Sequence, residues 1–166
     1  MVSAIQMDSA RPAEPVPSRT SEAYDALLDQ ILNLDLAPGA PLAESEIMER
    51  IGVGRTPLRE AVSRLASEHL VRVFPRRGTF VTEVNLADLP LITELRIGLE
   101  RAAAGAAAQR SLPADHERLR TLAAASETPD RDALSNDVLL HRAVYAAARN
   151  RYLEESAQRY LNLSVR

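Results

Sequence analysis

The side chains best suited to specific recognition in this chain are arginines, and they are concentrated in one segment. Seven arginines and two glutamates occur between residues 50 and 82, although the whole chain has a net charge of −3. A guanidinium can bind phosphate oxygens or pair with O6 and N7 of guanine through two hydrogen bonds. Because the cationic charge is local, it favours DNA as a partner over nonspecific adhesion to polyanions.

Residues 51–65, IGVGRTPLREAVSRL, have the pattern of a turn followed by a recognition helix. Gly52 can end one helix in the left-handed conformation, and Val53 is then expected to enter the core. Thr56 is the predicted N-cap of the next helix and Pro57 its predicted first residue. The apolar residues of that helix recur at helical spacing and are Leu58, Ala61, Val62 and Leu65. The residues expected to project away from this face are Arg55, Arg59 and Ser63.

Two short runs of β-branched and aromatic residues follow, separated by the turn sequence PRRG. They predict a two-stranded wing with Arg76 and Arg77 at its tip. His69 is assigned to the end of the recognition helix, in a structural role. Basic residues on an isolated amphipathic helix usually form a solvated face. The succession of turn, helix and wing favours DNA binding instead.

The preceding elements must position this segment. Residues 1–19 are rich in proline and small polar side chains, and they are expected to form a disordered tail. Thr20 or Ser21 is expected to cap a first helix, and a second helix is expected over about residues 44–51. With the recognition helix and the wing, these elements predict a winged helix over residues 20–85.

Residues 86–166 show helical periodicity alone. A long helix is expected over residues 86–110, and its apolar face consists of Leu89, Ile92, Leu95 and Leu99. Three further helices are expected. The first covers about residues 114–126, the second is capped by Thr128 and Pro129 and continues to about residue 148, and the third lies around residues 152–161. The predicted fold class is mostly α: a winged helix-turn-helix of three helices and a two-stranded wing, followed by an all-helical domain.

Composition excludes several other classes of protein. With no cysteine, the chain has no disulfide, thiolate nucleophile or zinc–thiolate site. Its glycines form no phosphate-binding loop and its three histidines no catalytic group, so an enzyme is not expected. No apolar run approaches the roughly 20 residues that span a bilayer, and the start of the chain does not read as a signal peptide. We expect a cytoplasmic protein with no membrane partner.

The winged-helix segment resembles the GntR family of bacterial transcription regulators over about residues 21–84. The residues that carry the resemblance are Pro38, Gly39, Leu42, Glu44, Ile47, residues 51–61, Leu70, Val71 and residues 75–81. The resemblance implies that Arg55, Thr56 and Arg59 contact operator DNA and that Gly78 lies near the minor groove. The full predicted set of DNA contacts is Arg55, Thr56, Pro57, Arg59, Ser63, Arg64, Arg76, Arg77, Gly78 and Thr79.

Two positions depart from the usual pattern of that family. Gly54 stands where the family usually has serine, so a hydroxyl that could cap the helix or touch phosphate is absent. Met48 stands where a small alanine is usual, which favours a wider helix crossing. Neither change alters the expected fold.

The second half resembles the effector-binding (FCD) domain of the FadR-like branch of the family, in residues 95–103, 136–141 and 148–153. The resemblance implies that Asp137 and His141, one helical turn apart, belong to a site for a divalent metal such as zinc, nickel or manganese. No histidine follows His141, so half of the donor set is present. Without the resemblance, such a pair is more often a surface or interhelical contact. Arg96 is expected either to meet an effector carboxylate or to form an interhelical salt bridge.

These resemblances imply a sequence-specific regulator, a repressor, whose affinity for double-stranded operator DNA is modulated by a small-molecule effector. A homodimer is expected if the helical domain is complete, because a dimer places two recognition helices one DNA turn apart. The chain stops at Arg166, where the family's domain usually continues, so an incomplete effector domain is expected. The alternatives are a winged-helix protein-interaction module and a shortened regulator that binds DNA without sequence preference.

Overall fold

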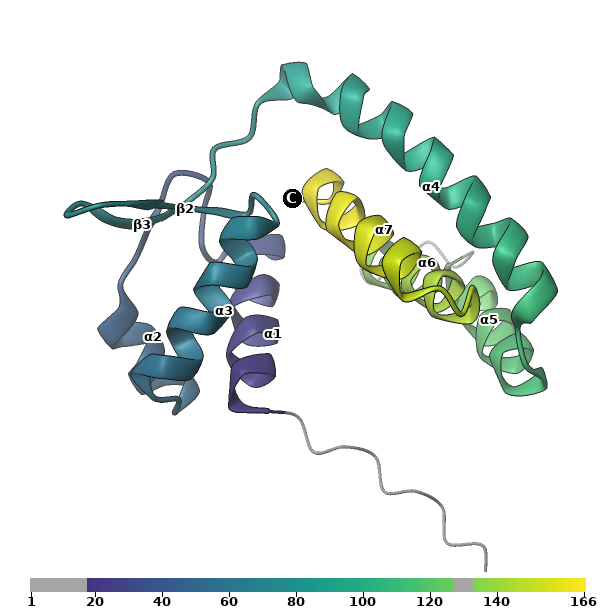
Figure 1. Cartoon of the computed structure of the whole chain (residues 1–166), viewed down its shortest axis with the longest axis horizontal. Coiled ribbons are helices and arrows are strands. Elements are labelled where there is room, and N and C mark those ends of the chain that lie inside the picture. Colours follow the sequence, from purple (N-terminus) through teal and green to yellow (C-terminus); the bar gives the residue numbers. More distant parts are fainter. Residues whose placement is uncertain (1–17, 127–132) are drawn as a thin grey trace, which may run out of the picture.

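The computed structural model describes residues 18–126 and 133–166. A winged unit and a helical unit lie next to each other (Figure 1). The elements of the winged unit are α1 (Arg19–Leu32), β1 (Pro41–Leu42), α2 (Glu44–Ile51), α3 (Arg55–Ser67), β2 (Val71–Phe74) and β3 (Gly78–Val81). The elements of the helical unit are η1 (Leu86–Asp88), α4 (Leu89–Arg110), α5 (Pro113–Ser126), α6 (Ala133–Ala147) and α7 (Arg151–Ser164). The predicted mostly α fold class is confirmed. The predicted cap at Thr128 and Pro129 lies outside the described residues, as does the predicted tail except for its last two residues.

The core of the winged unit lies between α1, α3 and the sheet. Its largest fully buried side chains are Leu27, Ile31, Leu58, Leu65, Leu70 and Val71. The predicted apolar face of α3 is confirmed, because all four of its residues are buried, and Val53 is buried after the turn. This apolar stripe sets the rotation of α3 about its own axis, so the other side of the helix is directed at solvent.

The first helix begins earlier than predicted, so neither Thr20 nor Ser21 is its N-cap. Ser18 has that role, and its Oγ accepts a hydrogen bond from the Ser21 backbone N–H at 3.1 Å. The segment PSRTSE offers three hydroxyl side chains of similar capping propensity. The packing of α1 on the core decided among them.

The recognition helix also begins earlier than predicted. It starts at Arg55, so Gly54 rather than Thr56 is its N-cap, and no side chain caps it. The Leu58 N–H donates to the Gly54 carbonyl at 3.2 Å and closes the first turn. Pro57 is therefore the third helical residue instead of the first. A proline is tolerated there because the first N–H groups of a helix have no intrahelical acceptor.

The wing belongs to a three-stranded antiparallel sheet of order β1–β3–β2, whereas two strands were predicted. The additional strand pairs Pro41 with Phe80 and Leu42 with Thr79. It is two residues long and contains a proline, so it has no alternating pattern that would reveal it in the sequence. His69 lies outside the recognition helix, in the turn before β2, with a φ of 64°.

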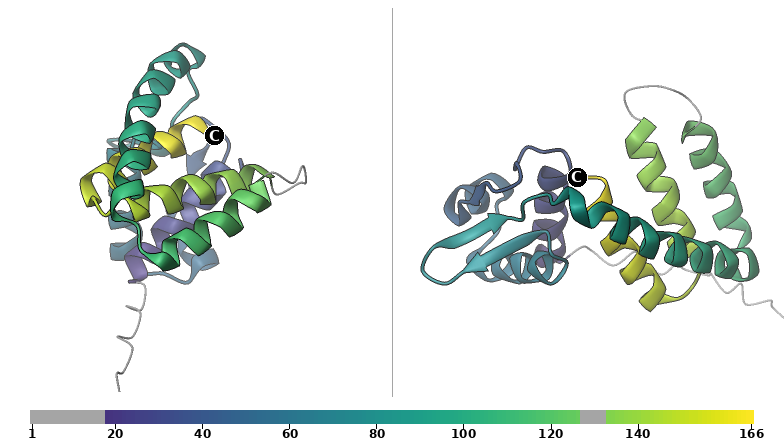
Figure 2. Two further views of the ribbon diagram at one scale, coloured as in Figure 1. Left: turned by 90° about the vertical axis from the view of Figure 1, so that its right-hand side faces the viewer. Right: turned by 90° about the horizontal axis from the view of Figure 1, so that it is seen from above.

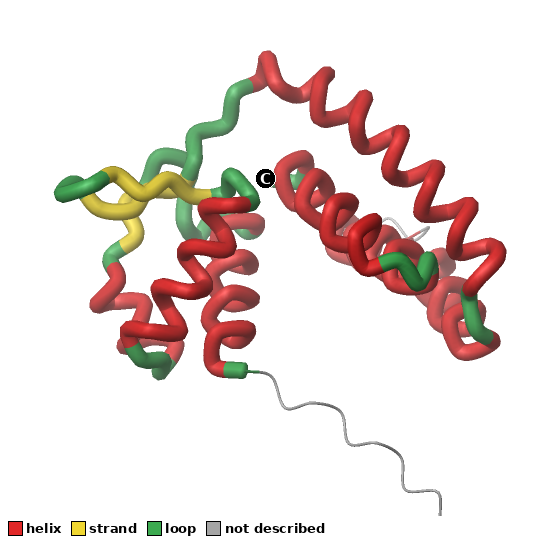
Figure 3. Tube along the Cα trace, viewed as in Figure 1, coloured by secondary structure: helices red, strands yellow, loops and turns green. Residues whose placement is uncertain are grey.

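The helical unit contains no strand in its described residues, and Figure 3 shows the strands confined to the winged unit. α4 runs along one side, α5 and α6 lie side by side, and α7 returns toward the winged unit (Figure 1 and Figure 2). The buried cluster contains Ala103, Tyr145, Ala157 and Leu161. The small alanines of α4 and α7 let these helices approach closely around the Tyr145 ring.

The apolar face predicted along α4 is only partly buried. Leu99 packs against the helical core, but Leu89 and Leu95 are 49% and 42% exposed. The single helix predicted from residue 86 is also interrupted, because η1 precedes α4. Between residues 18 and 126, and from 133 to 166, no helix is long and apolar enough to cross a membrane.

Candidate nucleic-acid interface

The N-terminal half of α3 presents polar side chains on the face opposite the core. The exposed residues of this face are Arg55, Thr56, Arg59 and Ser63. Pro57 is half-buried. The Nε of Arg59 lies 3.9 Å from Oε2 of Glu44, and 66% of the Arg59 side chain is exposed. An exposed ion pair at this distance contributes little stability, so Arg59 is free to exchange Glu44 for a DNA phosphate or base.

The turn between β2 and β3 carries the residues predicted to contact DNA from the wing. The Arg77 N–H donates to the Phe74 carbonyl at 3.1 Å and closes the turn. Arg76 and Gly78 have φ values of 64° and 100°, and both are exposed together with Arg77. At Gly78 this conformation is accessible without strain because glycine has no Cβ. The wing tip and the N-terminal end of α3 lie on the side of the winged unit that faces away from the helical unit (Figure 1).

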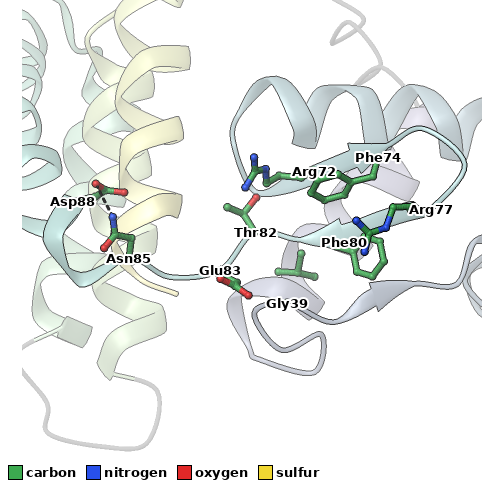
Figure 4. A pocket seen from close by; sticks show the side chains of 10 residues that line it. Gly39, Arg72, Phe74, Arg77, Phe80, Thr82, Glu83, Asn85 and Asp88 are labelled. Atoms are coloured by element: carbon green, nitrogen blue, oxygen red, sulfur yellow. Dashed lines mark hydrogen bonds between the residues drawn. The ribbon is translucent and has the colours of Figure 1, made fainter.

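An aromatic pair stiffens the outer face of the wing. The rings of Phe74 and Phe80 meet edge to face with centroids 5.8 Å apart. The guanidinium carbon of Arg72 lies 5.4 Å from the Phe74 ring centroid. Figure 4 shows these side chains with Arg77 around one hollow. Arg72 was counted among the arginines of this segment but was left out of the predicted contact set, and its spacing from Phe74 in a strand places the two on one face.

Two residues of the predicted contact set are held elsewhere. Thr79 is 5% exposed, so nearly all of its surface is withdrawn from solvent. Arg64 packs on α1, because its guanidinium carbon lies 3.7 Å from the Tyr24 ring centroid and its Nε 3.2 Å from Oε1 of Glu68. Five residues separate Arg64 from Arg59, which is about 140° around a helix. The rotation set by the core face therefore turns Arg64 away from the exposed N-terminal face of α3.

We expect Arg64→Ala to lower stability while leaving operator affinity nearly unchanged. The substitution removes the stacking on Tyr24 and the ion pair with Glu68, together about 0.5–1.5 kcal/mol of unfolding free energy. Operator affinity, measured by fluorescence anisotropy, should change by less than about twofold, because the Arg64 guanidinium is held by Tyr24 and Glu68 instead of lying beside Arg59. A loss as large as that expected for Arg59→Ala would mean that Arg64 leaves Tyr24 and joins the interface.

The turn into α3 allows a paired test of backbone strain. Gly52 has a left-handed φ of 72°, whereas Gly54 has an ordinary φ of −78°. A Cβ would meet no atom within 4 Å at Gly52 and only the Pro57 ring, at 3.9 Å, at Gly54. We expect Gly52→Ser to lower the free energy of unfolding by about 1–2 kcal/mol. We expect Gly54→Ser to raise it by about 0.5–1 kcal/mol, since serine adds a capping hydroxyl and restricts the unfolded chain. Urea denaturation followed by circular dichroism measures both, and equal effects would contradict the strain argument.

In the helical unit, Arg96 and His141, two residues of the predicted effector and metal sites, both contact Glu100. Glu100 was not among the predicted site residues. Its carboxylate accepts hydrogen bonds from Arg96 Nη2 at 2.9 Å and from the Tyr145 hydroxyl at 2.5 Å, and it lies 2.9 Å from His141 Nδ1. Burial opposes ionisation of Glu100, but the hydrogen bonds outweigh it and hold the pKa of Glu100 below its ordinary value. Burial and the bond to Glu100 raise the pKa of Tyr145. Glu100 is therefore an anion that joins α4 to α6.

Arg96 connects two helices, although its acidic partner lies in its own helix. Its Nη2 pairs with Glu100, while its Nη1 donates to Ser164 Oγ in the last turn of α7 at 2.8 Å. The contact between helices is thus a hydrogen bond to serine in place of the salt bridge offered as an alternative. A hollow of about 270 Å³ beside it is lined by Thr93, Arg96, Ile97, Glu100, Arg101 and His141. The effector-binding role of Arg96 stays a prediction.

Asp137 and His141 face each other from successive turns of α6. His141 Nε2 lies 3.7 Å from Asp137 Oδ2, and His141 Nδ1 meets Glu100. Within residues 18–126 and 133–166, no three His, Asp or Glu side chains are grouped to hold one ion. Oriented metal sites need about three protein donors. The described residues therefore do not by themselves fit the divalent metal that the resemblance implied, and His141 serves as a link between two carboxylates.

Two family models match this chain, and together they cover both units. Residues 19–81 match the family described as "Bacterial regulatory proteins, gntR family", and residues 91–166 match the FCD domain. An uncharacterized HTH-type transcriptional regulator of Agrobacterium vitis is 38% identical over 109 residues, which are 66% of this chain and 64% of that protein. The HTH-type transcriptional repressor RspR of Escherichia coli is 35% identical over 97 residues, 58% of this chain and 41% of RspR.

Solved structures agree with these sequence matches. E. coli McbR/YncC superposes with a TM-score of 0.72 at 28% identity, over 90% of this chain and 72% of that one. A GntR protein from Rhodococcus sp. RHA1 superposes with a TM-score of 0.62 at 26% identity, over 90% and 73%. The chain spans between a third and just under two thirds of the length of the first curated relatives that it matches. The prediction of a regulator in place of an enzyme is confirmed by these relatives.

Proposed function

Because this chain belongs to the GntR family of bacterial regulatory proteins and carries an FCD domain after its winged helix, we propose that it represses transcription by binding an operator as a homodimer. α3 enters the major groove with its N-terminal end, and the wing contacts the adjacent backbone or minor groove. The named repressor RspR, which is 35% identical over 97 residues, supports the sign of the regulation.

A single observation carries the proposal. Arg55, Thr56 and Arg59 of α3 and the two arginines at the wing tip are exposed. The wing and the N-terminal end of α3 lie on the side of the winged unit away from the helical unit (Figure 1). Two cationic projections from one side can grip one duplex at a groove and its flanking phosphates. Dimerisation would place two such surfaces one helical turn apart, so the operator would be a near-palindrome.

The helical unit supplies the proposed control. A small carboxylate would bind at the hollow beside Arg96, where a guanidinium is the natural receptor for it. Asp137 and His141 would contribute to a divalent metal site only together with further donors. The effector would act by population shift, favouring the arrangement of the two winged units that fits the operator less well.

The test is selection of genomic DNA fragments by the purified chain at near-physiological salt, followed by sequencing. Enrichment of a short palindrome would support a specific, dimeric regulator. Weak retention of random DNA that is lost as salt rises would refute sequence-specific recognition by this chain. No retention at all would favour a winged helix that binds a protein partner.

A further inference from the structure

The last helix, α7, contributes side chains to both hydrophobic cores. Leu161 is fully buried in the core of the helical unit, with Ala157 one turn before it. Leu163, two positions later, packs against the core of the winged unit. A displacement of the end of α7 is therefore felt by both units, because packed cores do not deform continuously.

A hydrogen bond ties the end of α7 to the base of the wing. Nη1 of Arg166 donates to the backbone carbonyl of Thr82 at 3.2 Å, directly after β3. The backbone N–H of Thr82 donates to Leu70 at 2.9 Å, and the N–H of Val81 donates to Ala40 at 2.9 Å. Arg166 therefore holds the point at which the sheet joins the segment leading to the helical unit. Burial lowers the pKa of its guanidinium, and it remains a cation.

The last residue of α7, Ser164, is held by Arg96 of α4. Ser164 Oγ accepts the hydrogen bond from Arg96 Nη1 at 2.8 Å and donates to the Leu161 carbonyl at 2.7 Å. Arg96 is in turn fixed by Glu100 at 2.9 Å. Two residues of one short segment are thus held at both ends: Ser164 bonds to Arg96 beside Glu100, and Arg166, two positions later, bonds to the wing base.

An open cleft of about 510 Å³ lies at this joint. Helical-unit residues line most of it, among them Leu89 of α4 and Leu163 of α7, and His69 and Thr82 line it from the winged unit. A joint with an open cleft can pivot at low cost, whereas a fully packed interface would not.

We propose that residues 161–166, the last turn of α7 and the two residues after it, are the coupling element of this protein, and that Ser164 and Arg166 position the wing according to the state of Arg96. Its regulatory meaning rests on the proposed function, since a ligand at Arg96 would draw the guanidinium from Ser164. The coupling itself is a property of the free chain. It can be measured without DNA or effector.

Hydrogen exchange of the whole chain tests the coupling. We expect Ser164→Ala and Arg166→Ala to speed exchange at the Val81 and Thr82 amides by at least about threefold, with α3 amides unchanged. Ser164 has no hydrogen bond to the wing, so an effect there must pass through α7. Ser164→Thr keeps the hydroxyl and should restore wild-type exchange.

Two matched controls exist in the chain. Ser126 Oγ bonds to the Leu122 carbonyl at the end of α5, as Ser164 does in α7, and Arg110 donates to the Ala148 carbonyl as Arg166 does to Thr82. Ser126→Ala and Arg110→Ala should leave the wing amides unchanged. Equal exchange in Ser164→Ala and Ser126→Ala would overturn the proposal.

A double variant separates coupling from two independent effects. If Arg96 acts through Ser164, the variant Arg96→Ala with Ser164→Ala exchanges no faster at Thr82 than either single variant. Multiplicative effects would overturn the proposed order of contacts. If hydrogen exchange shows the coupling but operator selection fails, only the proposed function is rejected. If operator selection succeeds but hydrogen exchange shows no coupling, only the coupling is rejected.

Discussion

Replacing Arg59 with alanine is expected to weaken binding to the selected operator by about 1–3 kcal/mol, which is about 5- to 150-fold in affinity. Arg59 is exposed near the N-terminal end of α3, and its nearest acidic partner, Glu44, is 3.9 Å away. If it reads a guanine, the lost bidentate pair also relaxes specificity at that base. Anisotropy titrations with the operator and with single-base variants measure both effects.

The matched control is Arg120→Ala on α5. Arg120 is also an exposed helical arginine with a loose ion pair, 3.4 Å from Glu117, but it lies far along the chain from the winged unit. Its replacement should leave operator affinity within about twofold. If Arg59→Ala weakens binding to the operator and to random DNA by the same factor, Arg59 does not read a base and instead contacts a phosphate.

Replacing Leu65 with alanine is expected to cost about 2–5 kcal/mol of unfolding free energy. Leu65 is fully buried at the centre of the core that holds α3 against α1. Because domains are stable by about 5–15 kcal/mol, a loss of this size removes a large part of the stability of the winged unit. Operator binding should fail at lower urea concentration or temperature than in the wild-type chain. Urea denaturation followed by far-UV circular dichroism gives the free energy.

Leu91→Ala is the control for that substitution. Leu91 is also a helical leucine, but it is 65% exposed on α4. Its truncation should change the free energy of unfolding by no more than about 0.5 kcal/mol. If Leu65→Ala lowers the free energy of unfolding by less than about 1 kcal/mol, the core around α3 relaxes and fills the space of the missing side chain.

Local patterns were enough to predict the three helices of the winged unit and two of the three strands of its sheet. The apolar repeat of α3, the left-handed Gly52 and the hairpin around Gly78 each depend on residues a few positions apart. Such features are encoded by periodicity and backbone preference, which a single sequence displays. Capping was predicted less well, because Ser18 and its neighbours have similar propensities and a shift of one or two residues costs little.

The sequence by itself determined the order of the helices, the two strands of the wing and the exposed arginines of α3 and the wing, since these follow from spacing along the chain. It determined the class of the protein through its resemblance to a known family. Only the tertiary structure decided that Arg64 packs on Tyr24, that Thr79 is buried and that Glu100 joins His141 and Tyr145. It also decided the pairing of β1 and the two-sided packing of α7. These features join residues about 40 or more positions apart, or depend on how far a helix is rotated on its core, and no local preference specifies either.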